Sequence, residues 1–168
     1  MTYQEEIDQG FLRSAAYHEA GHAVAMLTGV DPRITREITI IPGPNGCGRT
    51  EGDYEFSPYL KPDLARLVKN VTVLLAGRTS ERCLWGMNGG FDRESLTDLK
   101  KAQQWVGSIA PEKKERRALM RWIAAHTKCS VTTHWPCIEA VAEALLVEKV
   151  LERDRFMDIV EEVQLLQS

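Results

Sequence analysis

The sequence lacks long apolar runs and concentrated positive charge. No stretch reaches the roughly 18 apolar residues of a membrane-spanning helix, and the polar start MTYQEEIDQG is unlike a secretory signal. We therefore predict a cytoplasmic protein without a membrane segment. A net charge of -3 and the absence of a long Lys/Arg run argue against a nucleic-acid partner.

The sequence also lacks a CxxC pair, because its four cysteines are scattered along the chain. They are Cys47, Cys83, Cys129 and Cys137. Such scatter favours reduced, mostly buried thiols over a disulfide framework. With 168 residues, 43% hydrophobic and 27% charged, the composition is typical of a globular protein, and we expect residues 1–168 to form a single domain.

Helical periodicity dominates the rest of the chain. Small apolar residues recur at helical spacing from Arg13 to about Leu27, whereas the β-branched run REITII and a second extended stretch flank the turn-rich GPNGCG and predict a hairpin. Further helices are expected from Leu64 to about Trp85, from Ser95 onward, from Pro111 to His126, from Trp135 to Val150 and from Arg153 to Leu166. The expected fold class is α+β, mainly α-helical and bundle-like, with a small β-hairpin after the first helix.

The strongest motif is HEAGH, at His18 to His22. Residues four apart share one face of a helix, so the two imidazoles can bind one metal ion. Zinc suits such nitrogen ligands, and a catalytic zinc has three protein ligands and one open position. Two unrelated core histidines are the alternative, but HExxH arises by chance in such a chain on the order of once in a hundred or less.

Glu19 follows the first histidine of this motif and lies about 100° around the helix from it. Its carboxylate can reach a zinc-activated water, take its proton and pass it to a leaving amine. The motif therefore predicts hydrolysis of peptide bonds, with Glu19 as the general base.

The third ligand is left open by spacing alone, and carboxylates are the better candidates. Glu81 shares the apolar stripe of its predicted helix, so it is a buried acid that needs a partner. That partner is either Arg78 or a ligand histidine. Asp98 is the rival, although Ser95 to Asp98 also fits a capping box at a helix start.

Three segments, AAYHEAGHAVA, LLAGRTSERCLWG and SLTDLKKAQ, resemble successive motifs of the FtsH-type zinc metalloproteases in order and spacing. In that family the first motif supplies two histidine ligands and the catalytic glutamate, and an aspartate in the third supplies the last ligand. The resemblance implies His18, His22 and Asp98 as zinc ligands, Glu19 as the base and Glu81 as a buried supporting carboxylate.

The resemblance covers nearly the whole chain, since ITIIPGPNGCGRT resembles the family's hairpin and ALLVEKVLERDRF its closing helical region. It is looser before Asp98, where the family has a Gly-Ala-rich approach and this chain has Arg93, Glu94, Ser95 and Leu96. Glu94 is therefore a further candidate for the third ligand.

The resemblance implies a zinc-dependent endopeptidase acting on unfolded or flexible polypeptide, and a hexameric ring. Family members carry an ATPase domain and membrane helices ahead of the peptidase domain, and this sequence has neither, so we expect any ATP-driven unfolding to come from a separate polypeptide. The alternative from another class is a zinc-containing binding or regulatory module without useful proteolysis. A zinc hydrolase of small amides is a third interpretation.

Overall fold

The computed structural model describes residues 3–28, 37–43, 48–51, 63–86 and 93–167, with the side chains of residues 3–7, 93–95 and 167 excepted. These ranges form six helices and three short strands. In chain order they are α1 (Tyr3–Leu27), β1 (Glu37–Thr39), β2 (Arg49–Thr50), α2 (Leu64–Trp85), α3 (Arg93–Ile109), α4 (Lys113–Thr133), α5 (Trp135–Glu148), β3 (Val150–Glu152) and α6 (Arg153–Gln167). The predicted mainly helical α+β class is confirmed.

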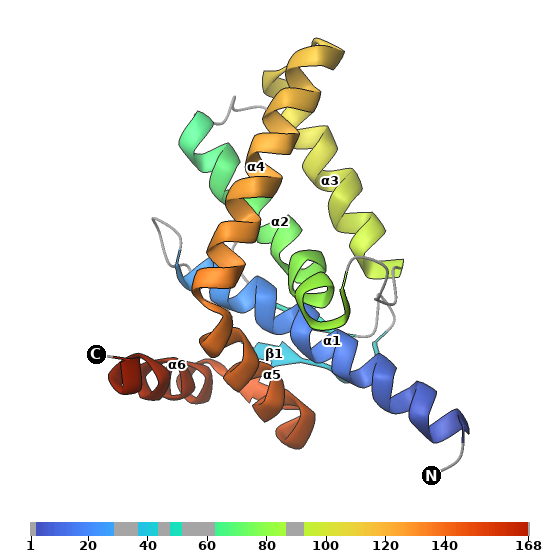
Figure 1. Cartoon of the computed structure of the whole chain (residues 1–168), viewed down its shortest axis with the longest axis vertical. Coiled ribbons are helices and arrows are strands. Elements are labelled where there is room, and N and C mark those ends of the chain that lie inside the picture. Colours follow the sequence, from blue (N-terminus) through green and yellow to red (C-terminus); the bar gives the residue numbers. More distant parts are fainter. Residues whose placement is uncertain (1–2, 29–36, 44–47, 52–62, 87–92, 168) are drawn as a thin grey trace.

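Helix α1 is central to the fold. Figure 1 shows it running between α2 and α3 on one side and α5 and α6 on the other, and it packs directly against α2 and α5. It begins at Tyr3, ten residues before the predicted start at Arg13, so that boundary was wrong. The added turns are rich in Glu and Gln, which favour helix, and Tyr3, Ile7 and Phe11 recur every four residues, so the sequence did carry a helical signal there.

Helices α1 and α2 approach each other closely. A Cβ added at Gly21 of α1 would lie 2.8 Å from the carbonyl oxygen of Ala76 in α2 and would also meet the Ser80 hydroxyl. Only a residue without a side chain permits this separation of the two helix backbones. The close approach brings the buried face of α2 against the HEAGH segment.

The three strands form one antiparallel sheet in the order β2-β1-β3, with Ile38 paired to Thr50 on one side and to Leu151 on the other. The predicted hairpin is therefore confirmed as β1 and β2. Strand β3 was not predicted, because its residues were assigned to a helix end and a connection. Helix α5 instead ends at Glu148, and the capping residue Lys149, with its left-handed φ of 65°, turns the chain into β3.

Two apolar clusters form the core of the described residues. The larger joins α1, part of α2, the sheet, α5 and α6 and includes Tyr17, Ile38 and Phe156. The smaller joins α2, α3 and α4 and includes Val71 and Ile123. Together these clusters hold both α1 and α3 against α2.

Two further predictions can be compared with the described residues. Helix α4 extends to Thr133, past the predicted end at His126. The cysteines at 83, 129 and 137 are free, as predicted. Cys83 and Cys129 are exposed, so the prediction of mostly buried thiols was wrong. Cys47 lies outside the described residues. Nowhere in the described ranges is a helix both long and apolar enough to span a bilayer.

Candidate metal centre

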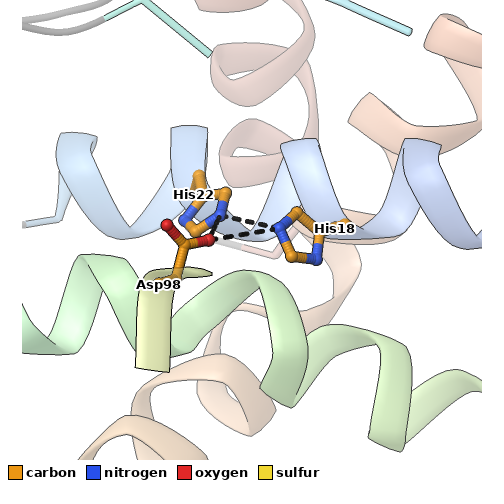
Figure 2. Close-up of side chains that lie close together, drawn as sticks. All are labelled: His18, His22 and Asp98. Atoms are coloured by element: carbon orange, nitrogen blue, oxygen red, sulfur yellow. Dashed lines mark hydrogen bonds and ion pairs between the residues drawn. The ribbon is translucent and has the colours of Figure 1, made fainter. Parts of the chain in front are cut away.

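The side chains of His18, His22 and Asp98 converge at one point between α1 and α3 (Figure 2). The two histidine Nε2 atoms lie 3.0 Å apart. Asp98 Oδ2 lies 3.6 Å from His18 Nε2 and 3.3 Å from His22 Nε2. Two imidazole nitrogens and one carboxylate oxygen therefore face a common centre.

The second ring nitrogen of each histidine is held by a partner that fixes the ring. His22 Nδ1 lies 2.8 Å from the carbonyl oxygen of Val73, and His18 Nδ1 lies 2.5 Å from Glu81 Oε1. A carbonyl oxygen can only accept a hydrogen bond, so His22 Nδ1 carries a proton and Nε2 is the nitrogen that faces the centre. The Glu81 carboxylate orients His18 in the same way.

Gly77 of α2 makes room for this centre. A Cβ added there would lie 2.6 Å from His22 Nε2 and 2.8 Å from His18 Nε2. Any side chain at position 77 would fill the space that the two nitrogens face. The cluster therefore requires a glycine at position 77, on the buried face of α2.

The dimensions of the cluster suit zinc. Ligands about 2.0–2.1 Å from a tetrahedral ion lie about 3.3–3.4 Å from one another. The observed separations of 3.0, 3.3 and 3.6 Å lie around that value. Two nitrogen ligands and one carboxylate oxygen are also a donor set that zinc accepts, with a fourth position left open.

The charges around the centre favour a positive charge. Burial opposes a charge on His18, but hydrogen bonds with Asp98 and Glu81 and the nearby Glu19 carboxylate raise its pKa from 6.5 to about 10. Burial likewise opposes the Asp98 charge, yet the hydrogen bonds with His18 and His22 hold the pKa of that carboxyl well below its usual range. Without a metal ion, a proton on His18 takes the place of the cation.

Glu19 is buried on α1 between the two histidines, with 4% of its surface exposed. The hydroxyl of Thr50 in β2 donates a hydrogen bond to its carboxylate. The Glu19 charge contributes to the raised pKa of His18, so this carboxylate lies near the cluster. It is not one of the three groups whose ligand atoms converge. The arrangement thus combines a metal-sized ligand set with a neighbouring base.

The structure also shows how the candidate acidic residues are placed. Helix α3 begins at Arg93, so Ser95 lies inside it and the capping-box interpretation of Asp98 was wrong. Glu81 bonds to His18 Nδ1 and accepts from the hydroxyl of Ser14, which places it behind the histidine and away from the ligand atoms. The side chain of Glu94 lies outside the described residues.

Three contributors to the site were missed in the sequence: Ser14, Thr50 and Gly77. A glycine inside an otherwise regular helical pattern often marks a close approach, so Gly77 carried a usable signal. Ser14 and Thr50 carried no such signal, because each contributes by bonding to a carboxylate that belongs to another element. Their roles depend on the packing of α1 against α2 and against the sheet.

No family model matches the chain. Individual proteins do match it. The chain is 27% identical over 175 residues to "ATP-dependent zinc metalloprotease FtsH 1" of Alkaliphilus metalliredigens, a match that covers 86% of this chain and 28% of that protein. It is 38% identical over 100 residues to an ATP-dependent zinc metalloprotease FtsH 3 of Conexibacter woesei, covering 56% of this chain and 13% of that protein.

A third relative, the ATP-dependent zinc metalloprotease FtsH of Syntrophotalea carbinolica, is 25% identical over 193 residues, covering 89% of this chain and 29% of that protein. The chain thus spans less than a third of the length of each of these relatives. Two of the matches extend over most of the chain.

Proposed function

Because the chain is related in sequence to the FtsH-type ATP-dependent zinc metalloproteases, we propose that it is a zinc-dependent endopeptidase. The observation that carries the proposal is the convergence of His18, His22 and Asp98, whose ligand atoms all lie within 4.8 Å of one another. Their separations and donor types match a tetrahedral zinc site with one open position. We choose zinc as the metal and proteolysis as the reaction because the relatives are named zinc metalloproteases.

In this proposal His18, His22 and Asp98 hold the ion, and Glu81 supports His18 from behind. Bound zinc supplies Lewis-acid chemistry, which acidifies water and polarises a substrate carbonyl. The Val73 carbonyl and the Glu81 carboxylate keep both Nε2 lone pairs aimed at the centre. Burial of both histidines limits competing contacts with solvent.

Glu19 is the proposed general base. Its carboxylate takes one proton from the attacking water and returns it to the nitrogen of the leaving amine, so that the net reaction is peptide plus water to acid plus amine. A carboxylate suits this shuttle because it is ionised at neutral pH and has two acceptor oxygens. Its position beside His18 in the chain places it next to the ligand cluster.

The proposed substrate is flexible or unfolded polypeptide, and residues 1–168 are proposed to act as one domain. The names of the relatives include ATP dependence. For this protein we propose that a separate ATPase provides the ATP-driven unfolding of substrates. Assembly into a hexameric ring is proposed on the same ground. Each of these points concerns whole proteins of which this chain matches less than a third.

Metal analysis and peptide cleavage on three proteins test the proposal. The wild type should contain near-stoichiometric zinc and cleave casein or a mixed peptide library. Asp98→Asn should lose most zinc, because an amide oxygen is a poorer ligand than a carboxylate. Glu19→Gln should keep the metal and the fold but lose about 10²–10⁴ in kcat, the usual effect of removing a general base.

Glu148→Gln is a matched control for the charge change, because Glu148 is exposed and its carboxylate bonds to Arg155. It should retain both zinc and activity. A wild type that stays metal-free after incubation with zinc would overturn the proposal. A zinc-loaded wild type that cleaves no peptide, beside an active related protease, would replace it with a binding or regulatory module of the same fold.

A further inference from the structure

We propose that Thr50 is a positioning residue for Glu19, holding the base at a fixed rotation beside the ligand cluster. The inference rests on the proposed function, since it takes Glu19 as the general base. It adds a strand, β2, to a site whose other side chains come from helices.

The contact between Thr50 and Glu19 is a short side-chain hydrogen bond. Thr50 Oγ1 lies 2.5 Å from Glu19 Oε2 and 3.2 Å from the Glu19 carbonyl oxygen. A threonine hydroxyl has one proton to donate. The shorter distance and the negative charge assign that proton to the carboxylate, as a charge-assisted bond of the strong class.

The sheet delivers Thr50 to this position. Thr50 pairs with Ile38 of β1, and the backbone N–H of Glu51 donates to the carbonyl oxygen of Glu37, 3.0 Å away. Successive side chains of a strand point to opposite faces. Arg49 and Glu51 accordingly form an ion pair of 3.0 Å with each other, while Thr50 between them faces α1.

The backbone at Gly48 closes a second side of the same carboxylate. A Cβ added there would lie 2.7 Å from Glu19 Oε1 and 2.8 Å from Glu19 Cγ. The main chain leading into β2 therefore packs against one oxygen of Glu19 while Thr50 bonds to the other. Two independent contacts from one short segment thus restrict the rotation of a side chain that would otherwise have several rotamers.

Restricting Glu19 has a direct catalytic consequence. A general base must lie within hydrogen-bond reach of the proton that it takes, and a misplacement of about 1 Å can cost about 10²-fold in rate. Removing the Thr50 hydroxyl should therefore lower kcat while leaving substrate affinity and the metal ligands unchanged.

The test compares Thr50→Val, which keeps the shape but loses the hydroxyl, with Thr50→Ser, which keeps the hydroxyl. We expect Thr50→Val to retain zinc and KM and to lose about 10- to 100-fold in kcat. Thr50→Ser should recover most of that loss. Thr39→Val is the matched control, because the Thr39 hydroxyl in the neighbouring strand bonds to the carbonyl oxygen of Lys149 and not to Glu19.

A double-mutant cycle on unfolding of the metal-free protein gives a readout that does not need activity. Thr50→Val should raise the unfolding equilibrium constant by about fivefold or more in the wild-type background. In a Glu19→Ala background the same change should have little effect, because the acceptor is already gone. Additive effects would overturn the inference.

The outcomes separate this inference from the function on which it rests. An active wild type whose Thr50→Val variant keeps full kcat, or whose Thr50→Ser variant is equally slow, overturns the role of Thr50 alone. A zinc-loaded wild type without peptidase activity overturns the proposed function and, with it, the catalytic role of this bond, even where the cycle detects the contact.

Discussion

At the scale of single residues, the partner behind each histidine decides what the histidine can bind. The Glu81 carboxylate and the Val73 carbonyl hold the Nδ1 atoms, so the Nε2 atoms face Asp98. In the metal-free protein the acidic side chains around His18 retain a proton that a metal ion must displace.

That competition predicts proton release on metal binding. The pKa of His18 is raised from 6.5 to about 10, so its proton is held at pH 7 and is lost only as the pH approaches 10. Zinc binding at pH 7 should release about one proton from His18, and affinity should rise about tenfold per pH unit between pH 6 and pH 8. Isothermal titration calorimetry in buffers of different ionisation enthalpy measures the protons released.

The Glu81→Gln variant provides the comparison for the number of protons released. It replaces the carboxylate behind His18 with a neutral amide. Loss of that charge should lower the pKa of His18 and reduce the protons released at pH 7. Binding of zinc by the wild type without proton release would contradict the charge state inferred for the metal-free site.

Local spacing was enough to predict some of these residues and not others. His18 and His22 share a helix face, so their convergence follows from the sequence alone. Asp98 needed the family resemblance, because its place opposite α1 depends on how α3 packs. Ser14 and Thr50 act across elements, and no local pattern indicates a contact between two side chains far apart in the chain.

At the scale of elements, the metal centre depends on how closely α1 and α2 approach. Gly77 leaves open the space between the two Nε2 atoms, and Gly21 allows the helix backbones to meet. The same contact orders the ligands and is part of the larger apolar cluster. Side-chain volume on this face of α2 should therefore control metal binding.

Gly77→Ala tests this control. Its Cβ would lie 2.6 Å from His22 Nε2, so we expect zinc affinity to fall by about 100-fold or more while the helical circular dichroism spectrum is kept. Gly107→Ala is the control, because a Cβ there meets only the Arg116 side chain, at 3.6 Å or more. Both changes favour helix, so unchanged zinc affinity in Gly77→Ala would show that the space is not needed.

Most helices were predictable because each carries its own apolar period, whereas strand β3 was not. Three residues between two helices give too short a pattern, and the strand exists only because Leu151 pairs with Ile38 of β1. The first turns of α1 could have been predicted as well, because Tyr3, Ile7 and Phe11 lie four residues apart in a segment rich in Glu and Gln.

At the scale of the whole molecule, the ligands join α1 and α3, which lie far apart in the chain. A metal ion that binds only the folded chain stabilises it by mass action, by about 2.7 kcal/mol at a free concentration 100 times Kd. For a protein of this size that corresponds to a rise in Tm of about 5–10 °C. Chelation should lower the Tm of the wild type by this amount.

The double variant His18→Ala, His22→Ala is the control, because its Tm should not respond to zinc or to a chelator. Differential scanning calorimetry of both proteins, with and without zinc, makes the comparison. Equal responses of the wild type and the double variant would mean that zinc acts elsewhere on the chain.

The sheet order β2-β1-β3 has a consequence for synthesis of the protein. Ribosomes make β1 and β2 long before β3, so the nascent chain has the base and its threonine partner while the central strand still lacks one neighbour. The HEAGH segment likewise emerges well ahead of Asp98. The complete centre can form only after α3 has been made, and a nascent chain that stops before α3 cannot assemble the three-ligand site.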